Sequence, residues 1–303
     1  MEAEGYERLL GRLREMPAVA VGFSGGADST LLLAVAKEAL GDRVLALTAV
    51  TPFTERQEVT DALDLGTRLG VCHELVELAM PEGVETNPPD RCYLCKRALF
   101  GKLLQVARDA GFGQVIEGSN LDDLGDFRPG MRALQELDIE SPLLTCKLSK
   151  ADVRRLSESL GLPTWNKPTN ACLLTRLPIG QRVTMDDLNR LEEAERFLRT
   201  RGFLCVRVRV HGDLARIEVT PEQRQRLLGE AEIVAETLEG LGFRHITLDL
   251  SGYRLGSMNA VGIGCDRTPA NPAAAPAADP TPPEPVSLET DWPAHSGGKA
   301  KSG

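Results

Sequence analysis

The first stretch whose residues could carry chemistry is VGFSGGADST, residues 21–30. An apolar run ends there in a turn that contains Ser24, Gly25 and Gly26, and Asp28 and Ser29 then open a helical pattern. Such a turn can expose a nucleophilic serine, clasp a dinucleotide, or cradle phosphates with free backbone N–H groups. An ordinary strand-to-helix turn, with Asp28 as a charge at the helix N-terminus, is the plainer alternative.

The surrounding sequence weighs against two of these interpretations. A serine hydrolase needs an acid and a histidine downstream, and the contexts of the four histidines suggest no triad. The turn also lacks the glycine spacing of a dinucleotide fingerprint and the lysine of a Walker A loop. The string from Ser24 to Ser29 instead resembles the loop of the PP-loop ATP-pyrophosphatases, which cleave ATP between its α and β phosphates and adenylate a substrate.

Three of the seven cysteines form a second group of reactive residues. Cys92 and Cys95 form a Cys-x-x-Cys motif that opens a helix predicted to start at Lys96, and Cys172 lies in a later loop. The spacing alone leaves a zinc corner, a redox pair, an iron–sulfur site and chance all open. Three thiolates around a cubane cluster would leave one iron without a protein ligand.

Composition and charge narrow the class of protein. The chain has 303 residues, 42% of them hydrophobic, and a net charge of −9 with a pI near 5.2. The broad basic footprint of most RNA-binding proteins is missing from these totals. We expect no nucleic-acid partner, no membrane span and no signal peptide, and we predict a cytoplasmic location with cysteines kept as thiols or metal ligands.

Alternating elements predict the fold of the first half. Apolar runs alternate with helical patterns, which is typical of βαβ units and a parallel sheet. The runs lie at 18–23, 44–50, 74–78 and 114–117, and the helical patterns at 28–40, 55–69 and 96–110. Capping boxes are expected from Thr54 to Gln57 and from Ser149 to Asp152.

The rest of the chain has a different pattern. A helix starting at Thr184, a hairpin over 205–211 and 214–219, a helix starting at Thr220 and a strand over 245–250 predict a small α+β unit. We therefore predict three parts: residues 1–180, residues 181–263, and a disordered Pro/Ala-rich tail over 264–303.

The hairpin carries a group of arginines. Strand alternation places Arg207 and Arg209 on one face, and a two-residue turn sets Arg209 opposite Arg216 and Arg207 opposite Glu218. The second pair predicts a cross-strand salt bridge. The like-charged pair should be destabilising unless an anion or an acidic partner lies between them, and two solvated arginines splayed apart are the alternative.

Together these stretches resemble the three-cysteine branch of the LarE family, the PP-loop sulfur transferases that help to make the nickel-pincer nucleotide cofactor. The resemblance spans about residues 15–260. It rests on the strings SGGADS (24–29), NPPDRCYLCK (87–96), GSNLDD (118–123), DFRPG (126–130), WNKP (165–168), ACL (171–173) and RVR (207–209). It implies an α/β fold: a PP-loop ATP-pyrophosphatase (adenine nucleotide alpha hydrolase-like) parallel sheet with a smaller C-terminal α+β domain.

The resemblance also implies an activity. ATP would adenylate the carboxylates of a pyridinium-3,5-biscarboxylate mononucleotide, and sulfur would replace AMP to give thiocarboxylates. One branch of the family gives up the sulfur of the cysteine corresponding to Cys172, whereas the other holds a [4Fe–4S] cluster on three cysteines. The alternatives are a tRNA 2-thiolating PP-loop enzyme and a non-catalytic nucleotide-binding module.

The residues expected to act follow from the matching strings. Those expected to bind ATP with Mg²⁺ are Ser24, Gly25, Gly26, Asp28, Ser29 and Gly118. Those expected in catalysis are Cys172, Asp28 and Lys96, and those expected to bind substrate are Arg207, Arg209 and Arg128. The cluster would be held by Cys92, Cys95 and Cys172. The family also implies a homo-oligomer, and the sulfur donor stays open.

Overall fold

The computed structural model describes residues 2–125, 129–168 and 171–253. The chain divides into two compact units, residues 1–261 and 262–303. The predicted tail over 264–303 lies outside the described residues, so its disorder stays a prediction.

A four-stranded parallel sheet forms the first half, with strand order β3-β2-β1-β4. Its strands are β1 (Val19–Gly22), β2 (Val44–Val50), β3 (Cys72–Glu77) and β4 (Val115–Ile116). The mostly buried strands β1, β2 and β4 lie within apolar runs, since strands buried on both faces need continuous apolar residues. The edge strand β3 is mostly exposed and overlaps the run over 74–78. The predicted α/β fold with a parallel sheet is confirmed.

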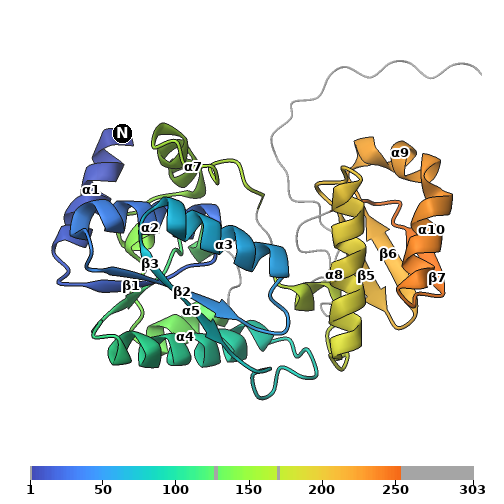
Figure 1. Cartoon of the computed structure of the whole chain (residues 1–303), viewed down its shortest axis with the longest axis horizontal. Coiled ribbons are helices and arrows are strands. Elements are labelled where there is room, and N and C mark those ends of the chain that lie inside the picture. The colour runs from blue at the N-terminus through green and yellow to red at the C-terminus, as the bar shows by residue number, and fades with distance from the viewer. Residues whose placement is uncertain (1, 126–128, 169–170, 254–303) are drawn as a thin grey trace, which may run out of the picture. The chain divides into compact units, whose positions relative to one another are not determined.

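Helices cover both faces of this sheet (Figure 1). One layer contains α1 (Glu2–Arg14), α2 (Ala27–Leu40), α3 (Arg56–Arg68), α6 (Pro142–Thr145) and α7 (Lys150–Ser159). The other contains α4 (Arg91–Asp109) and α5 (Pro129–Glu136). The strand residues alternate between two apolar clusters, with Val19 and Val21 in the first layer's cluster and Ala20 in the second's.

In the first half, two helix starts differ from the predictions. Helix α4 begins at Arg91 rather than Lys96, because the carbonyl of Asp90 accepts the N–H groups of Tyr93 and Leu94. Both cysteines of the Cys-x-x-Cys motif therefore lie inside the helix. The expected capping box at Thr54 is wrong, since the Thr54 hydroxyl binds Thr51 and α3 starts at Arg56.

Two predicted helix caps are confirmed, whereas Thr220 is followed by a short 3₁₀ turn (Pro221–Gln223) without a side-chain cap, and α9 (Arg224–Gly229) starts only after that turn. Ser149 and Asp152 form the capping box of α7, and the Thr184 hydroxyl accepts the N–H of Asp187 at the start of α8 (Met185–Thr200). In both cases a side chain satisfies an N–H group that the helix itself leaves open.

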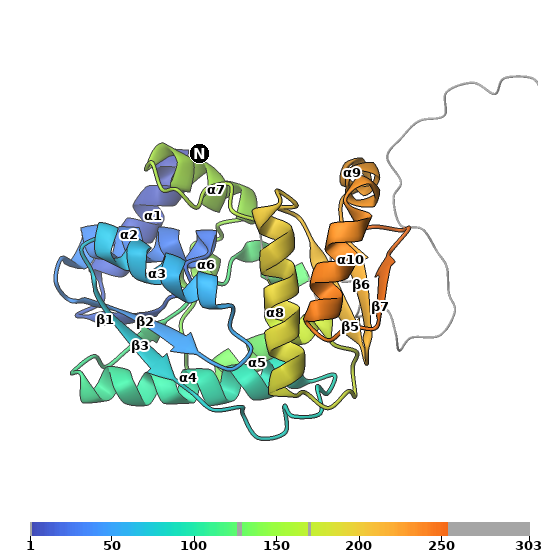
Figure 2. The same cartoon turned by 45° about the vertical axis from the view of Figure 1, so that its right-hand side comes forward.

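A second, three-stranded sheet lies in the C-terminal half, with order β5-β6-β7. Its strands are β5 (Arg207–His211), β6 (Leu214–Glu218) and β7 (His245–Leu248), and its helices are α8, α9 (Arg224–Gly229) and α10 (Ala231–Gly240) (Figure 2). The hairpin register is the predicted one, and β7 joins it parallel to β6. Val206, Val208 and Val210 are fully buried in the core of this sheet.

One loop of the first half is tied to the segment around Cys172. The side-chain amide of Asn87 lies 3.3, 3.0 and 2.9 Å from the carbonyl oxygens of Leu174, Leu177 and Pro178. Asn87 is fully buried and has a φ of 47°, a left-handed conformation that asparagine tolerates. The apolar core of the second sheet also includes Phe53 and Val84 from the first half. The domain boundary at residue 180 stays a prediction.

We predict that Asn87→Ala lowers the free energy of unfolding by about 2–4 kcal/mol, because it removes a buried donor and places a Cβ-bearing residue without a compensating amide at positive φ. Chemical denaturation measures the change. Asn87→Gly is the matched control, since glycine relieves the backbone cost and loses the amide alone. An Asn87→Ala variant as stable as the unaltered protein would contradict this role.

Candidate active site

The turn after β1 forms a compact loop that leads into the first turn of α2. The Ser24 N–H donates to the Ser29 hydroxyl at 3.2 Å, and the two hydroxyl oxygens lie 3.1 Å apart. Gly25 has a φ of 68°, and Gly26 is the N-cap of α2 without a side chain to cap the first N–H groups. The free N–H groups and the helix dipole together suit a phosphate.

Gly118 lets the end of β4 approach this loop closely. A Cβ on Gly118 would lie 3.0 Å from the backbone nitrogen of Ser29 and 3.1 Å from the carbonyl carbon of Asp28. These atoms belong to the first turn of α2, which cannot move without moving the loop. Only glycine therefore fits at position 118 without displacing the loop.

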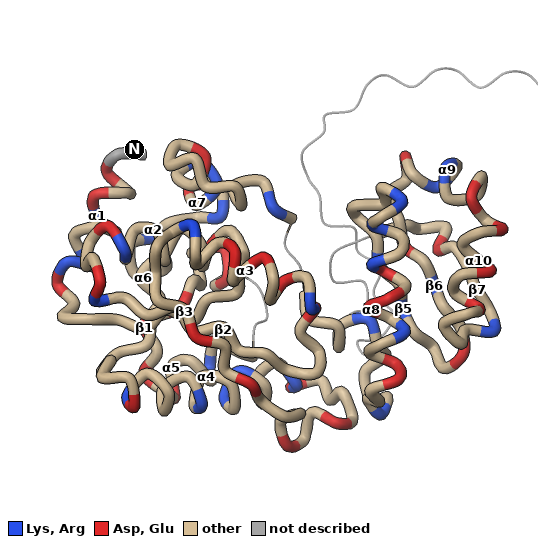
Figure 3. Tube along the Cα trace, in the orientation of Figure 1, with Lys and Arg blue, Asp and Glu red and all other residues tan. Residues whose placement is uncertain are grey.

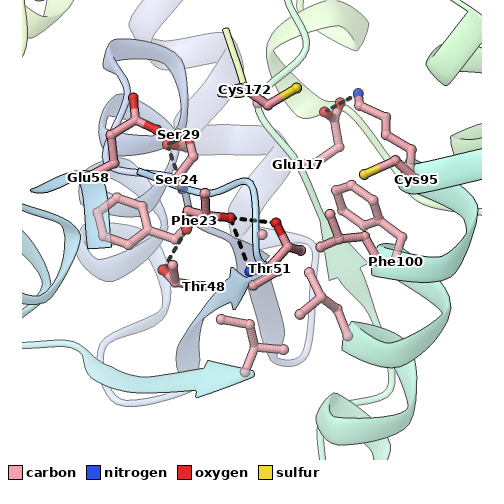
Figure 4. A pocket seen from close by; sticks show the side chains of 18 of the residues that line it. Phe23, Ser24, Ser29, Thr48, Thr51, Glu58, Cys95, Phe100, Glu117 and Cys172 are labelled. Carbon is pink, nitrogen blue, oxygen red and sulfur yellow. Dashed lines mark hydrogen bonds and ion pairs between the residues drawn. The ribbon is translucent and has the colours of Figure 1, made fainter. Parts of the chain in front are cut away.

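A cavity of about 410 Å³ opens beside the loop (Figure 4). Three segments far apart in the sequence line it: the loop residues Ser24, Asp28 and Ser29; Cys95 and Lys96 of α4; and Cys172. Gly118 lines it as well. The cavity thus brings together the three predicted catalytic residues and the predicted nucleotide-binding residues other than Gly25 and Gly26.

The carboxylate of Asp28 is held from two sides. Lys150 forms an ion pair with Asp28, and the Asn120 amide donates to it at 3.0 Å. A second lysine, Lys167, lies 3.2 Å from the Gly25 carbonyl oxygen and 3.1 Å from Asp61. Sequence reasoning did not single out these polar residues for the site. The only feature of the sequence that drew attention to Lys150 was its place at the first position of the helix predicted from Ser149.

Lys96 faces a buried carboxylate. Its ammonium lies 3.8 Å from Glu117, which also accepts hydrogen bonds from the Ser119 backbone, the Ser119 hydroxyl and the Ser141 hydroxyl. Glu117 follows β4 and lines the same cavity. Glu117 therefore fixes the position of the Lys96 charge at the cavity wall.

The pKa values of Cys95 and Cys172 both respond to the other thiols. Burial raises the pKa of Cys95 to about 12, and the neighbouring Cys172 and Cys92 add to the rise. Burial also raises the pKa of Cys172, Cys92 adds to this, and Arg176 and Arg91 act in the opposite direction. A helix start can lower the pKa of a thiol, but burial raises the pKa of Cys95. Over the described ranges, no group of three or more His, Cys, Asp or Glu side chains is arranged to hold a metal ion.

Arg176 holds the backbone around Cys172. Its guanidinium is fully buried, and it donates to the carbonyls of Ala171 and Cys172. It also pairs with Glu195 at 3.0 Å and with Glu55 at 3.1 Å. Burial acts to lower the pKa of Arg176, but the two glutamates outweigh it and raise the pKa.

The hairpin arginines are buried rather than solvated. Arg209 pairs with Glu218 through two hydrogen bonds of 3.0 Å and donates to the Thr175 carbonyl. Arg216 lies 3.1 Å from the same Glu218, so this carboxylate is the acidic partner expected between the like-charged pair. Arg207 is buried beside them, and neither Arg207 nor Arg209 lines the cavity. The alternative of two solvated arginines at Arg209 and Arg216 is wrong, because Glu218 pairs with both.

Substrate binding by Arg207 and Arg209 stays a prediction. Arg128, the third residue predicted to bind substrate, lies outside the described residues.

The described helices carry acidic and basic residues interspersed along their length (Figure 3). Ion pairs such as Arg56 with Glu192 and Arg12 with Glu15 lie on the surface of these helices. Within the part of the chain that the structure describes, no helix has the length and apolar character to cross a membrane.

Known proteins resemble most of this chain. The model of a family described as NAD synthase matches residues 11–86. The chain is 42% identical over 252 residues to an uncharacterized protein of Synechocystis sp., covering 82% of this chain and 94% of that protein. It is 37% identical over 254 residues to pyridinium-3,5-bisthiocarboxylic acid mononucleotide synthase of Lactiplantibacillus plantarum, covering 83% of this chain and 92% of the synthase. An uncharacterized protein of Methanocaldococcus jannaschii is 29% identical over 236 residues.

We predict that Gly118→Ala weakens ATP binding at least about tenfold, because the new Cβ pushes the first turn of α2 away from the loop that receives the phosphates. Titration calorimetry with ATP measures the loss. Gly113→Ala is the matched control, since a Cβ at Gly113 meets nothing within 4 Å. Equal ATP affinity in both variants would contradict the assignment of the loop.

Proposed function

Because the chain belongs to the LarE family of PP-loop sulfur transferases, we propose that it uses ATP to convert the carboxylates of a pyridinium-3,5-biscarboxylate mononucleotide into thiocarboxylates. One observation carries the proposal: a single cavity contains the phosphate-binding loop, Lys96, Cys95 and Cys172. A nucleotide site and a sulfur site that share one cavity suit an enzyme that activates a substrate and then transfers sulfur to it.

The proposed reaction has two steps. A carboxylate oxygen attacks the α phosphorus of ATP, the bond to the β phosphate breaks, and an acyl adenylate and pyrophosphate form. A sulfur nucleophile then attacks the acyl carbon, the bond from that carbon to oxygen breaks, and AMP leaves. Adenylation is needed because a carboxylate is a poor electrophile and AMP is a competent leaving group.

The loop from Ser24 to Ser29 supplies the phosphate site in this proposal. Its backbone N–H groups would receive the phosphates, and Mg²⁺ would neutralise the departing pyrophosphate. Asp28 is suited to the ion because carboxylate oxygens are the ligands that Mg²⁺ prefers. Lys96, held at the cavity wall by Glu117, would stabilise negative charge that develops at the reacting carboxyl.

The three cysteines suit a [4Fe–4S] cluster by their donor chemistry. Thiolates are the usual ligands of such clusters, and Cys95 and Cys172 line one cavity while Cys92 influences the pKa of both. A cluster bound by Cys92, Cys95 and Cys172 would supply an iron position without a protein ligand, where inorganic sulfur can be carried. The chain's own part is to keep Cys172 beside the nucleotide site through the contacts of Arg176 with its carbonyl.

The two alternative functions, tRNA 2-thiolation and non-catalytic nucleotide binding, fit the structure less well. A tRNA 2-thiolating enzyme needs a large basic surface for RNA, whereas charges of both signs are interspersed along the described helices. A non-catalytic nucleotide-binding module has no use for three thiols and a lysine beside the nucleotide. Comparing the binding of bulk tRNA with that of the pyridinium mononucleotide separates the first alternative from the proposal.

We predict that Asp28→Ala lowers substrate-dependent release of AMP and pyrophosphate by at least about 100-fold while the fold is retained, since the loss falls on charge stabilisation at the reacting phosphates. A coupled pyrophosphate assay measures the rate. Asp42→Ala is the matched control, because Asp42 follows the other end of α2 and is exposed. A normal rate of AMP and pyrophosphate release by Asp28→Ala would contradict the proposed role of the loop.

A second prediction concerns the origin of the sulfur. After anaerobic reconstitution, we expect Cys92→Ala, Cys95→Ala and Cys172→Ala each to lose most of the bound iron, because three thiolates are needed to hold the cluster. Iron counting measures this, and Cys205→Ala is the control. Intact-mass analysis after turnover tests the alternative: dehydroalanine at position 172, with Cys92 and Cys95 dispensable, would replace the cluster by a sacrificial cysteine.

A further inference from the structure

Arg91 is a buried arginine whose side chain has no partner among the residues that the structure describes. It is 5% exposed, and its Nε atom is fully buried without a hydrogen bond. Among the described residues, no ion pair, hydrogen bond or ring contact of its guanidinium is found. Burying an unpaired charge is costly, so such a residue is retained where an anion binds or a reaction needs it.

Other buried arginines nearby have their charge compensated. Arg176 pairs with Glu55 and Glu195, and Arg209 pairs with Glu218. Arg199 also binds Glu55 and Glu195, so this network holds its own charges in balance. Arg91 differs from Arg176 and Arg209 in lacking a carboxylate from the described chain.

The backbone places Arg91 next to the segment of Cys172. Arg91 is the first residue of α4, and its N–H donates to the Pro88 carbonyl at 3.1 Å. Asn87, just before that proline, binds the carbonyls of Leu174 and Leu177, which follow Cys172. The Arg91 charge also reaches the Cys172 thiol, because it opposes the rise in the pKa of that thiol.

Arg91 does not line the cavity beside the phosphate-binding loop, whereas Cys172 does. Its charge nevertheless acts on the Cys172 thiol at the wall of that cavity. The unpaired charge of Arg91 is therefore associated with Cys172.

We propose that Arg91 binds a carboxylate of the substrate beside Cys172, namely the carboxylate that is not being adenylated. The inference rests on the proposed function, in which the substrate has two carboxylates and adenylation removes the charge of only one. The planar fork of a guanidinium matches a carboxylate with two parallel hydrogen bonds. Arg91 would thereby hold the ring with the reacting carboxyl toward the thiols, and would favour two carboxylates over one.

The test is direct binding without turnover. Calorimetry compares two mononucleotides, the pyridinium-3,5-biscarboxylate and its counterpart with a single 3-carboxylate, on the unaltered full chain, Arg91→Gln, Arg91→Lys and Arg97→Gln. Arg97 lies on the same helix but is exposed, so Arg97→Gln is the matched control. We expect Arg91→Gln to lose about tenfold to hundredfold in affinity for the biscarboxylate and little for the monocarboxylate, with ATP affinity unchanged and Arg91→Lys in between.

Stability separates a binding role from a structural one. Removing an unpaired buried charge should leave the thermal unfolding temperature of Arg91→Gln equal to or above that of the unaltered protein, whereas a structural arginine would lower it. Equal losses for both mononucleotides, or a loss of bound iron with unchanged biscarboxylate affinity, would overturn the inference alone. Failure of the unaltered protein to bind the biscarboxylate would overturn the proposed function together with it.

Discussion

The position of the sulfur site depends on one buried guanidinium. Arg176 binds Glu55 at the start of α3, Glu195 in α8 and the carbonyls of Ala171 and Cys172. The same Glu195 accepts the backbone N–H of Val208 in the second sheet. Removing one member of a buried network leaves an uncompensated charge that costs about 3–5 kcal/mol. The segment of Cys172 is therefore fixed at once to the nucleotide-binding half and to the sheet of the C-terminal half.

Local sequence patterns were enough to predict those structural features that depend on residues close together in the chain. The parallel strands follow from apolar runs, the hairpin register from a two-residue turn, and the loop from Ser24 to Ser29 from its glycines and hydroxyls. Gly118 could be assigned from its string, and its close approach to α2 supplies the physical reason. The cavity then unites residues that form separate groups along the chain.

Contacts between distant residues could not be predicted in the same way. The pairs of Asp28 with Lys150 and of Arg176 with Glu55 join residues more than 120 positions apart, and neither has a spacing that marks it. The burial of individual side chains could not be predicted either. The raised pKa of Cys95 and the burial of Arg209 arise from packing between distant segments, which no short string reveals. That Arg91 lacks a carboxylate partner within the described chain becomes clear only when its contacts are compared with those of other buried arginines.

The central claim is that ATP activates a carboxylate of the substrate before sulfur arrives. A biscarboxylate mononucleotide with ¹⁸O in both carboxylates tests it directly, because the oxygen that attacks the α phosphorus leaves with AMP. The account predicts that each thiocarboxylate formed is matched by one AMP molecule that carries one ¹⁸O atom, read by mass spectrometry. Thiocarboxylate formation accompanied by unlabelled AMP would contradict it.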